Sequence, residues 1–180
     1  MRIGLIADTH VPEAGERLPA QVYDLLSGVD MVMHAGDMHI IEVLDWLEVI
    51  APVVAARGNG DGDGFRPPFP DDDPRVRQAH VLDLGGVRVG LTHGFPLPED
   101  TPWITQESLM NRVFGGAVDV IVCGDTHIAH VERTDAGVLI VNPGSPTLPR
   151  NIRAPGTVGI LTIDDGQASA EMLPLTSLSW

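Results

Sequence analysis

The chain has 180 residues, of which 43% are hydrophobic; this is enough for a real core, and we expect one domain over residues 1–180. Its formal net charge is −14 and it contains no lysine, which excludes a lysine Schiff base and a Gly-Lys-Ser/Thr phosphate loop. The acidity opposes tight binding to long nucleic acids, because such binding requires a basic surface.

The first two thirds of the chain alternate between β-like apolar runs and stretches with helical spacing. Apolar residues at helical spacing predict three helices, and Ile104, Leu109 and Val113 form the expected buried face of the third. In chain order, the predicted elements are strand 2–7, helix 18–26, strand 29–33, helix 40–50, strand 53–57, strand 87–91, helix 103–114 and strand 118–123.

From Val118 onward, the pattern is almost entirely that of strands joined by hairpins. We predict strands over 129–133, 137–141, 157–163 and 167–173, with turns at 135–137 and 164–166. Strand–helix alternation followed by hairpins indicates mixed sheets covered by helices, as in a two-sheet sandwich between helical layers.

Two segments, residues 61–74 and 173–180, can each be interpreted in two ways. Residues 61–74 are rich in proline, glycine and aspartate and are predicted as a surface loop, with strand-like sequence resuming at His80. This loop either borders a functional site and shapes substrate access, or is a solvated insertion. The apolar C-terminal end, residues 173–180, packs either on the body of the protein or on a second subunit, so a homo-oligomer is one expected assembly.

The single cysteine, Cys123, excludes an internal disulfide and a cysteine-based zinc cluster, and fits a reducing cytosol. The N-terminal residues enter the first predicted strand directly, without a signal-peptide pattern. No apolar run approaches the roughly 18 residues of a membrane span. We therefore expect a cytoplasmic protein without a membrane partner.

Five of the apolar runs end in residues of the kinds that bind metal ions. The ends are Asp8-Thr9-His10, Gly36-Asp37, Gly58-Asn59-Gly60-Asp61, Thr92-His93-Gly94 and Gly124-Asp125-Thr126-His127. Ligands bind at the carboxyl-end rim of open α/β sheets, so these residues are expected to converge. Imidazoles and carboxylates suit Mn, Fe and Zn, and two such ions can clamp a phosphoryl group during displacement. The expected ligands, sufficient for two ions, are Asp8, His10, Asp37, Asn59, His93, Asp125 and His127.

These motifs resemble those of the calcineurin-like metallophosphoesterases, and more narrowly the small single-domain bacterial and archaeal phosphodiesterases of that superfamily. The resemblance covers residues 1 to about 147, including Asn142-Pro143-Gly144-Ser145. It implies an α/β fold, a four-layer αββα sandwich of two mixed β-sheets flanked by helices. It also implies a metal-dependent phosphoesterase, expected to be a phosphodiesterase, that hydrolyses a small phosphate ester.

The same resemblance implies roles for the expected ligands. Asp8, His10 and His127 would hold the first metal, and Asp37 would bridge the two ions. Asn59 and His93 would hold the second, with Asn59 also touching the substrate phosphate, so Asp37, Asn59 and His93 are the expected catalytic residues. A hydroxide bridging the ions would attack phosphorus in line. The expected cofactors are two divalent ions, Mn²⁺ first, with Fe, Zn, Ni or Mg as alternatives.

Two residues depart from the family pattern. Asp125 stands where the family usually has a histidine that binds the second metal; an aspartate there would favour harder ions such as Mn²⁺. Gly60 stands where members often carry His or Cys, and in some branches that His is a general acid. With Gly60, the reaction would depend on metal-bound water, on a nearby histidine such as His39, or on good leaving groups.

Other polar residues near the motifs have structural alternatives. Asn59 could be an ordinary turn residue, and Arg57 either meets a phosphate oxygen or forms a salt bridge. Asp61 either orients its own loop or accepts a hydrogen bond from a ligand histidine. His34 is expected to be a core histidine. His130 is expected at the surface, as a substitute ligand if Asp125 does not bind.

Two further functions remain open. One is a phosphomonoesterase, including a protein phosphatase. The other is a non-catalytic, metal-binding interaction scaffold, as in the eukaryotic retromer subunit that shares this fold; Asp125 and Gly60 are the residues that favour it.

Overall fold

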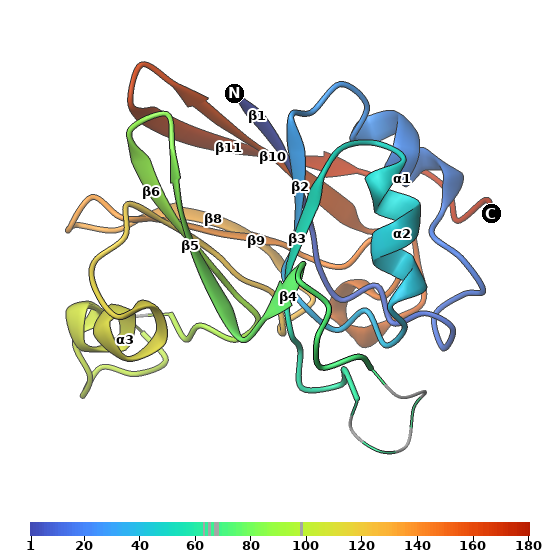
Figure 1. Cartoon of the computed structure of the whole chain (residues 1–180), viewed down its shortest axis with the longest axis horizontal. Coiled ribbons are helices and arrows are strands. Elements are labelled where there is room, and N and C mark those ends of the chain that lie inside the picture. The colour runs from blue at the N-terminus through green and yellow to red at the C-terminus, as the bar shows by residue number, and fades with distance from the viewer. Residues whose placement is uncertain (63, 65, 67–68, 98) are drawn as a thin grey trace.

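Two β-sheets lie face to face, and helices cover their outer faces (Figure 1). A computed structural model describes residues 1–180 except 63, 65, 67, 68 and 98. The elements in chain order are β1 (Arg2–Ile6), α1 (Ala20–Leu25), β2 (Met31–His34), α2 (Glu42–Glu48), β3 (Val53–Ala56), β4 (Val76–Arg77), β5 (Ala79–Leu84), β6 (Val87–Thr92), α3 (Gln106–Phe114), β7 (Val120–Val122), β8 (Ala129–Arg133), β9 (Leu139–Pro143), the 3-10 helix η1 (Pro149–Asn151), β10 (Thr157–Asp164) and β11 (Gln167–Pro174).

Both sheets are mixed. The first has six strands in the order β11-β10-β1-β2-β3-β4, and the second has five in the order β5-β6-β7-β9-β8. Strands β1 to β4 pair in parallel, as do β6, β7 and β9, while the hairpin strands pair antiparallel at the edges. Parallel neighbours present their carboxyl ends at one rim, which is what a converging site requires.

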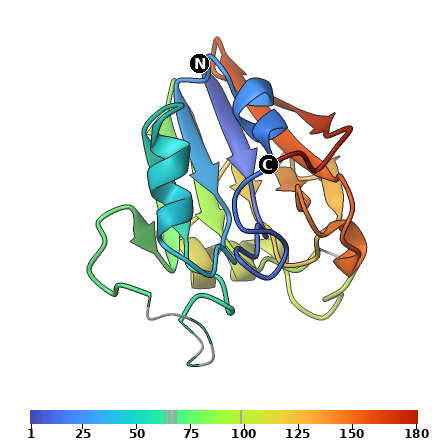
Figure 2. The same cartoon turned by 90° about the vertical axis from the view of Figure 1, so that its right-hand side faces the viewer.

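Three apolar layers separate the four layers of secondary structure. Alternation along β1 shows the division, since Ile3 and Leu5 pack between the sheets whereas Ile6 packs under α1 and α2. Figure 2 shows these two helices lying across the outer face of the six-stranded sheet. On the far side, Leu109 and Phe114 of α3 pack against the five-stranded sheet. The expected αββα sandwich is therefore confirmed.

The element boundaries differ from the predictions where local hydrogen bonds decide them. The third helix begins at Gln106 because the side chain of Thr105 accepts a hydrogen bond from Ser108 N at 3.2 Å, forming the N-cap. Its buried face is Leu109, Met110 and Phe114, whereas Ile104 and Val113 are only partly buried against the same core. The helices predicted at 18–26 and 40–50 are likewise shorter, as α1 and α2.

Two strand predictions also shift. The strand expected at 137–141 begins at Leu139, because Thr134 N donates to Val138 O at 2.9 Å and Gly137 takes a φ of 85° in that turn. The two-residue strand β4, which pairs with β3, was not predicted. The described residues of the predicted loop 61–74 form no helix or strand.

The C-terminal segment packs on the body of the protein. Ala20 N donates to Ser179 O at 2.8 Å, the side chain of Gln21 bonds Thr176, and Leu175 is buried in the core beside α1. Of the two expected placements of residues 173–180, the structure shows packing on the body of the protein, and the homo-oligomer stays a prediction.

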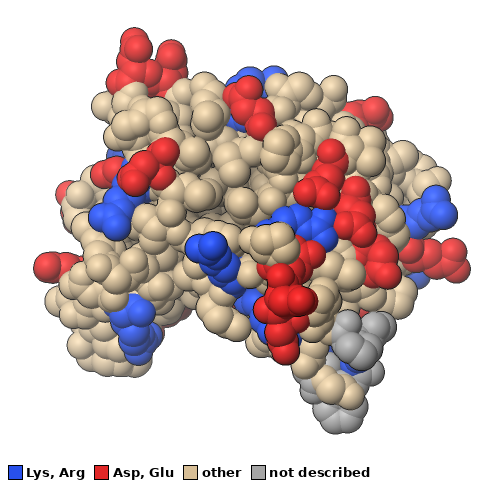
Figure 3. Space-filling model, viewed as in Figure 1, with Lys and Arg blue, Asp and Glu red and all other residues tan. Residues whose placement is uncertain are grey.

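Acidic side chains occur at many points on one face of the protein (Figure 3). On the face shown in Figure 3, carboxylates and arginines alternate and the described residues form no continuous basic stripe. Arg75, for example, is surrounded by carboxylates, with Nη1 2.8 Å from Asp45 and 2.9 Å from Glu48. No helix among the described residues is long and apolar enough to cross a membrane.

Candidate metal centre

The side chains that follow five different strands meet at one rim of the sandwich. Asp8 and His10 follow β1, Asp37 follows β2, and Asn59 follows β3; His93 follows β6, and Asp125 and His127 follow β7. In Figure 2 the arrowheads of β1 and β2 point to the lower edge, where the connecting loops gather. Backbone bonds join the loops, with Asp8 N donating to Gly36 O at 2.9 Å and Gly124 N to His93 O at 2.8 Å. The structure thus brings together the residues that the sequence predicted to converge.

The backbone at this rim is unusual. Six chemically active residues have a positive φ: Asp8 (53°), His10 (49°), Asp37 (57°), His39 (71°), Asp125 (73°) and His127 (58°). A left-handed backbone costs free energy in a residue other than glycine and persists only where surrounding contacts impose it. Such strained positions cluster at functional sites, so the local conformation itself marks this rim.

Asp8 is the most buried of the acids. It is 0% exposed; Oδ1 accepts from Asp125 N at 3.2 Å, whereas Oδ2 has no hydrogen-bond partner. Burial first, and then the charge of Asp37, raise the pKa of the Asp8 carboxyl well above its usual value. An unpartnered buried carboxylate oxygen is costly, and a cation beside it would reverse both effects.

Two imidazoles present an unprotonated nitrogen to the rim. His93 Nδ1 lies 2.7 Å from Ala35 O, and His127 Nδ1 lies 3.0 Å from Leu148 O. A carbonyl only accepts, so Nδ1 carries the proton in both neutral rings and Nε2 is left with a lone pair. In metalloproteins, a hydrogen bond of this kind from the other ring nitrogen orients a metal-binding histidine.

Several oxygens surround His93 Nε2. They lie at 3.0 Å for Asn59 Oδ1, 3.5 Å for Asp125 Oδ1 and 3.6 Å for Asp37 Oδ1. Electron pairs gathered in this way repel one another unless a proton or cation lies between them. The donor set of nitrogen and oxygen suits a divalent transition metal.

Asp37 lies between two groups of ligand atoms. Its Oδ2 is 3.5 Å from His10 Nε2, while its Oδ1 is 3.6 Å from His93 Nε2 and accepts from Gly60 N at 2.7 Å. The two oxygens therefore face different imidazoles, which is the arrangement needed in a carboxylate that bridges two ions. The described residues include three groups with ligand atoms within 4.8 Å of one another: Asp8, His10 and His127; His10, Asp37 and His39; and Asp8, Asp37 and His93.

His39 is a member of this cluster that the sequence indicated only as a nearby histidine. It is 0% exposed; Nδ1 contacts Glu13 Oε2 at 2.6 Å, and Nε2 has no hydrogen-bond partner. Its ring lies 4.2 Å from that of His10 between centroids. A Cβ atom on residue 60 would come within 2.7 Å of His39 Nε2, so Gly60 leaves the room that His39 occupies.

His10, like His39, has a buried ring nitrogen without a hydrogen-bond partner. Its Nε2 is buried without a hydrogen bond, and the ring lies 4.7 Å from that of His127. Burial first, and then the neighbouring His39, lower the pKa of His10 to about 4. The ring is therefore neutral at pH 7, as a metal ligand must be.

Asp61 holds the loops that carry these residues. Its buried carboxylate accepts three backbone N–H groups, from Asp37 at 3.0 Å, His39 at 2.8 Å and Gly58 at 2.8 Å. Of the two expected roles for Asp61, the structure shows the one that orients loops. The hydrogen bonds of Asp61 reach beyond its own loop to the turn after β2.

The remaining polar residues are structural or peripheral. His34 is fully buried, with Nδ1 accepting from Gly36 N and Nε2 beside Thr9 Oγ1, so it is the expected core histidine. Arg57 forms a salt bridge with Asp71 at 2.6 Å. His130 contacts Glu132 at 3.2 Å and lies outside the three groups. Asp125 also lies outside them, and its side chain is 56% exposed.

Comparison with known proteins agrees with this geometry. The sequence pattern of the calcineurin-like phosphoesterase superfamily domain matches residues 1–166. A probable metallophosphoesterase from Methanothermobacter thermautotrophicus is 35% identical over 173 residues, which cover 96% of this chain and 92% of that protein.

Solved structures with a similar fold come from bacteria and eukaryotes. A Thermotoga maritima protein solved by NMR is 30% identical with a TM-score of 0.69, covering 97% of this chain and 99% of that one. Vps29 from Entamoeba histolytica, crystallised with Zn²⁺, is 24% identical with a TM-score of 0.68, covering 97% and 99%. The second likeness concerns the fold alone.

Replacing Asp61 by alanine is expected to destabilise the protein and loosen the site. Three buried N–H groups would lose a charged acceptor, so the free energy of unfolding should fall by at least about 3 kcal/mol. Urea denaturation measures this, with the exposed Asp72→Ala as the control. A change below about 0.5 kcal/mol would show that the three bonds contribute nothing net.

The metal-free protein is expected to lose stability in acid through His34. Burial, the largest cause, lowers the pKa of His34 from 6.5 to about 3. Between these values the unfolded chain binds a proton that the folded one does not, so the free energy of unfolding falls as pH drops below 6.5. The slope is at most about 1.4 kcal/mol per pH unit.

Denaturation of wild type and His34→Gln at several pH values tests this. The variant should show a shallower pH slope than wild type, and the partly exposed control His130→Gln should not. Parallel slopes in wild type and His34→Gln would contradict the assignment.

Proposed function

The chain belongs to the calcineurin-like phosphoesterase superfamily, and from this premise we propose that it is a metal-dependent phosphodiesterase acting on a small phosphate ester. The observation that carries the proposal is the set of buried ligand atoms without partners, Asp8 Oδ2 and the Nε2 atoms of His10 and His39. They lie around Asp37, whose two oxygens face different imidazoles.

The proposed ligand sets follow the distances. One ion would take Asp8, His10 and His127, whose ligand atoms lie within 4.8 Å of one another. The other ion would take Asn59, His93 and Asp125, because the side-chain oxygens of Asn59 and Asp125 both lie near His93 Nε2. Asp37 would belong to both. Mn²⁺ suits this oxygen-rich set, and Fe, Zn, Ni and Mg are the alternatives.

The protein's own residues would position the ester. When bound, two ions would supply an activated water and offset the charge of the phosphate oxygens. A cleft of about 440 Å³ beside the rim is lined by Arg57, Asn59 and His93 among others, and can admit a phosphate group. The amide of Asn59 and the fixed ring of His93 would then hold the phosphate against the rim.

A diester fits this site better than a monoester. Cavities flank the rim on two sides, one at Asn59 and one at Phe95. Each would take one ester substituent.

A second candidate function is an interaction scaffold. The fold likeness to Vps29, with TM-scores of 0.67 to 0.68, favours it, as do the departures at Gly60 and Asp125. Both candidates bind metal, so turnover has to separate them.

Hydrolysis of bis(p-nitrophenyl) phosphate and p-nitrophenyl phosphate is the deciding measurement. We expect Mn²⁺-dependent turnover of the diester that chelator abolishes, with slower turnover of the monoester. Asp37→Asn should lower kcat/KM by more than about 100-fold, since losing even an outer-shell partner of a metal ligand costs 10–100-fold. The exposed Asp72→Asn serves as the control. Folded, metal-loaded protein that hydrolyses neither ester would favour the scaffold, and faster monoester turnover would favour a phosphatase.

Metal titration tests Asp125. Asp125→Ala should weaken one of two Mn²⁺ binding events by about tenfold or more in calorimetry, while Asp125→His should retain both and bind Zn²⁺ relatively better. The matched control is His130→Ala, because His130 is the substitute ligand predicted from sequence. Unchanged stoichiometry and affinity in Asp125→Ala would remove Asp125 from the ligand set.

A further inference from the structure

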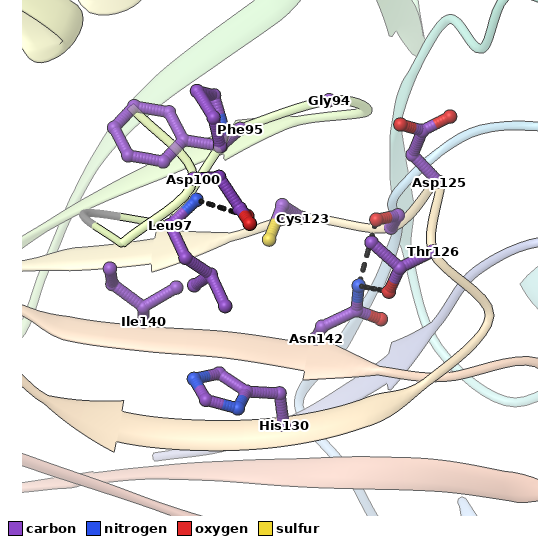
Figure 4. Close-up of a pocket in the computed structure, with 12 residues that line it drawn as sticks. Gly94, Phe95, Leu97, Asp100, Cys123, Asp125, Thr126, His130, Ile140 and Asn142 are labelled. Atoms are coloured by element: carbon purple, nitrogen blue, oxygen red, sulfur yellow. Dashed lines mark hydrogen bonds between the residues drawn. The ribbon is translucent and has the colours of Figure 1, made fainter. Parts of the chain in front are cut away.

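A cavity of about 440 Å³ opens beside Asp125, on the side of the rim away from Arg57. It lies between the loop after β6 and strands β7 and β9 (Figure 4). Gly94 and Asp125 line both this cavity and the cleft at Asn59. The two spaces are therefore neighbours beside the proposed metal site, and we call the first one the apolar cavity.

One wall of the apolar cavity is formed by apolar side chains. Figure 4 shows Phe95, Leu97 and Ile140 gathered on one side, with the sulfur of Cys123 facing them. The Cys123 side chain is buried and forms part of this wall.

The polar groups of the cavity are already in use. Asn142 Nδ2 donates to Gly124 O at 2.7 Å and to Thr126 Oγ1 at 3.0 Å, and its Oδ1 accepts from Gly144 N. This network fixes the backbone next to Asp125. A ligand would therefore gain little from hydrogen bonds to Asn142 and would bind by burying apolar surface.

The charged side chains that line the apolar cavity disfavour anionic ligands. Asp100 and Asp125 lie at its edge, and no arginine is found among its described lining residues. The one basic side chain, His130, is paired with Glu132 at 3.2 Å. A second phosphate or a carboxylate would meet negative charge without a cation to hold it.

We propose that the apolar cavity binds one ester substituent of the substrate, and that this substituent is an uncharged, largely apolar group about the size of a substituted phenyl ring or a nucleobase. The inference rests on the proposed function, because it places the phosphate at the rim. It defines the substrate class as diesters with one apolar arm beside Phe95 and one polar arm beside Arg57.

Binding of three matched diesters to the Mn²⁺-loaded protein tests the proposal. The probes are dimethyl phosphate, methyl phenyl phosphate and methyl 4-carboxyphenyl phosphate, with dissociation constants measured by calorimetry. We expect the phenyl ester to bind at least tenfold more tightly than the dimethyl ester, because the ring leaves water. The added carboxylate should abolish that gain.

Substitution at Leu97 locates the effect. Leu97 is partly buried in a loop, so Leu97→Asp is expected to fold; it should remove the phenyl preference without changing the affinity for dimethyl phosphate or Mn²⁺. Leu97→Ala should reduce the preference by a smaller factor. Val131→Asp is the control, since Val131 is 42% exposed on the neighbouring strand β8 and does not line the cavity.

The outcomes separate the two proposals. Equal affinities for the methyl and phenyl esters in wild type, or an undiminished preference in Leu97→Asp, would overturn the subsite. A preserved phenyl preference in a protein that hydrolyses no ester would overturn the catalytic function and leave the subsite standing. Absence of binding by all three probes would overturn the subsite together with the phosphate position.

Discussion

The buried carboxylate of Asp61 is the interaction on which the site depends most. It accepts hydrogen bonds from N–H groups in the turn after β2 and in the turn after β3. It therefore connects these two loops, although Asp37 and Asp61 lie 24 residues apart in the chain. Asp37 and Asn59 both follow their strands into loops, so the hydrogen bonds of Asp61 help to fix where these two residues lie.

Hydrogen bonds from backbone N–H groups also explain why several acidic side chains can lie close together at one rim. The carboxylates of Asp37 and Asp61 are bound by backbone N–H groups, which offsets their charge. Asp8 lacks such compensation at Oδ2, and its protonation is favoured by burial. A cation at this rim would therefore stabilise the arrangement, and folding and metal binding would then be linked.

The sequence was sufficient for the layers and for most of the rim. The convergence of the candidate ligand residues could be predicted because each follows a strand, and strand ends in parallel sheets converge. Details set by side-chain contacts could not be predicted in this way. His39 reaches the cluster through a left-handed turn and a contact with Glu13, which lies 26 residues away. Met110 and Phe114 are buried in α3, whereas the expected Val113 is only partly buried against the same core.

The contact between Gly60 and His39 has a consequence for sequence variation at this rim. A Cβ atom at position 60 would come within 2.7 Å of His39 Nε2, and His39 is 0% exposed, so a larger residue at position 60 requires the imidazole to shift. The residues tolerated at position 60 are therefore expected to depend on the residue at position 39.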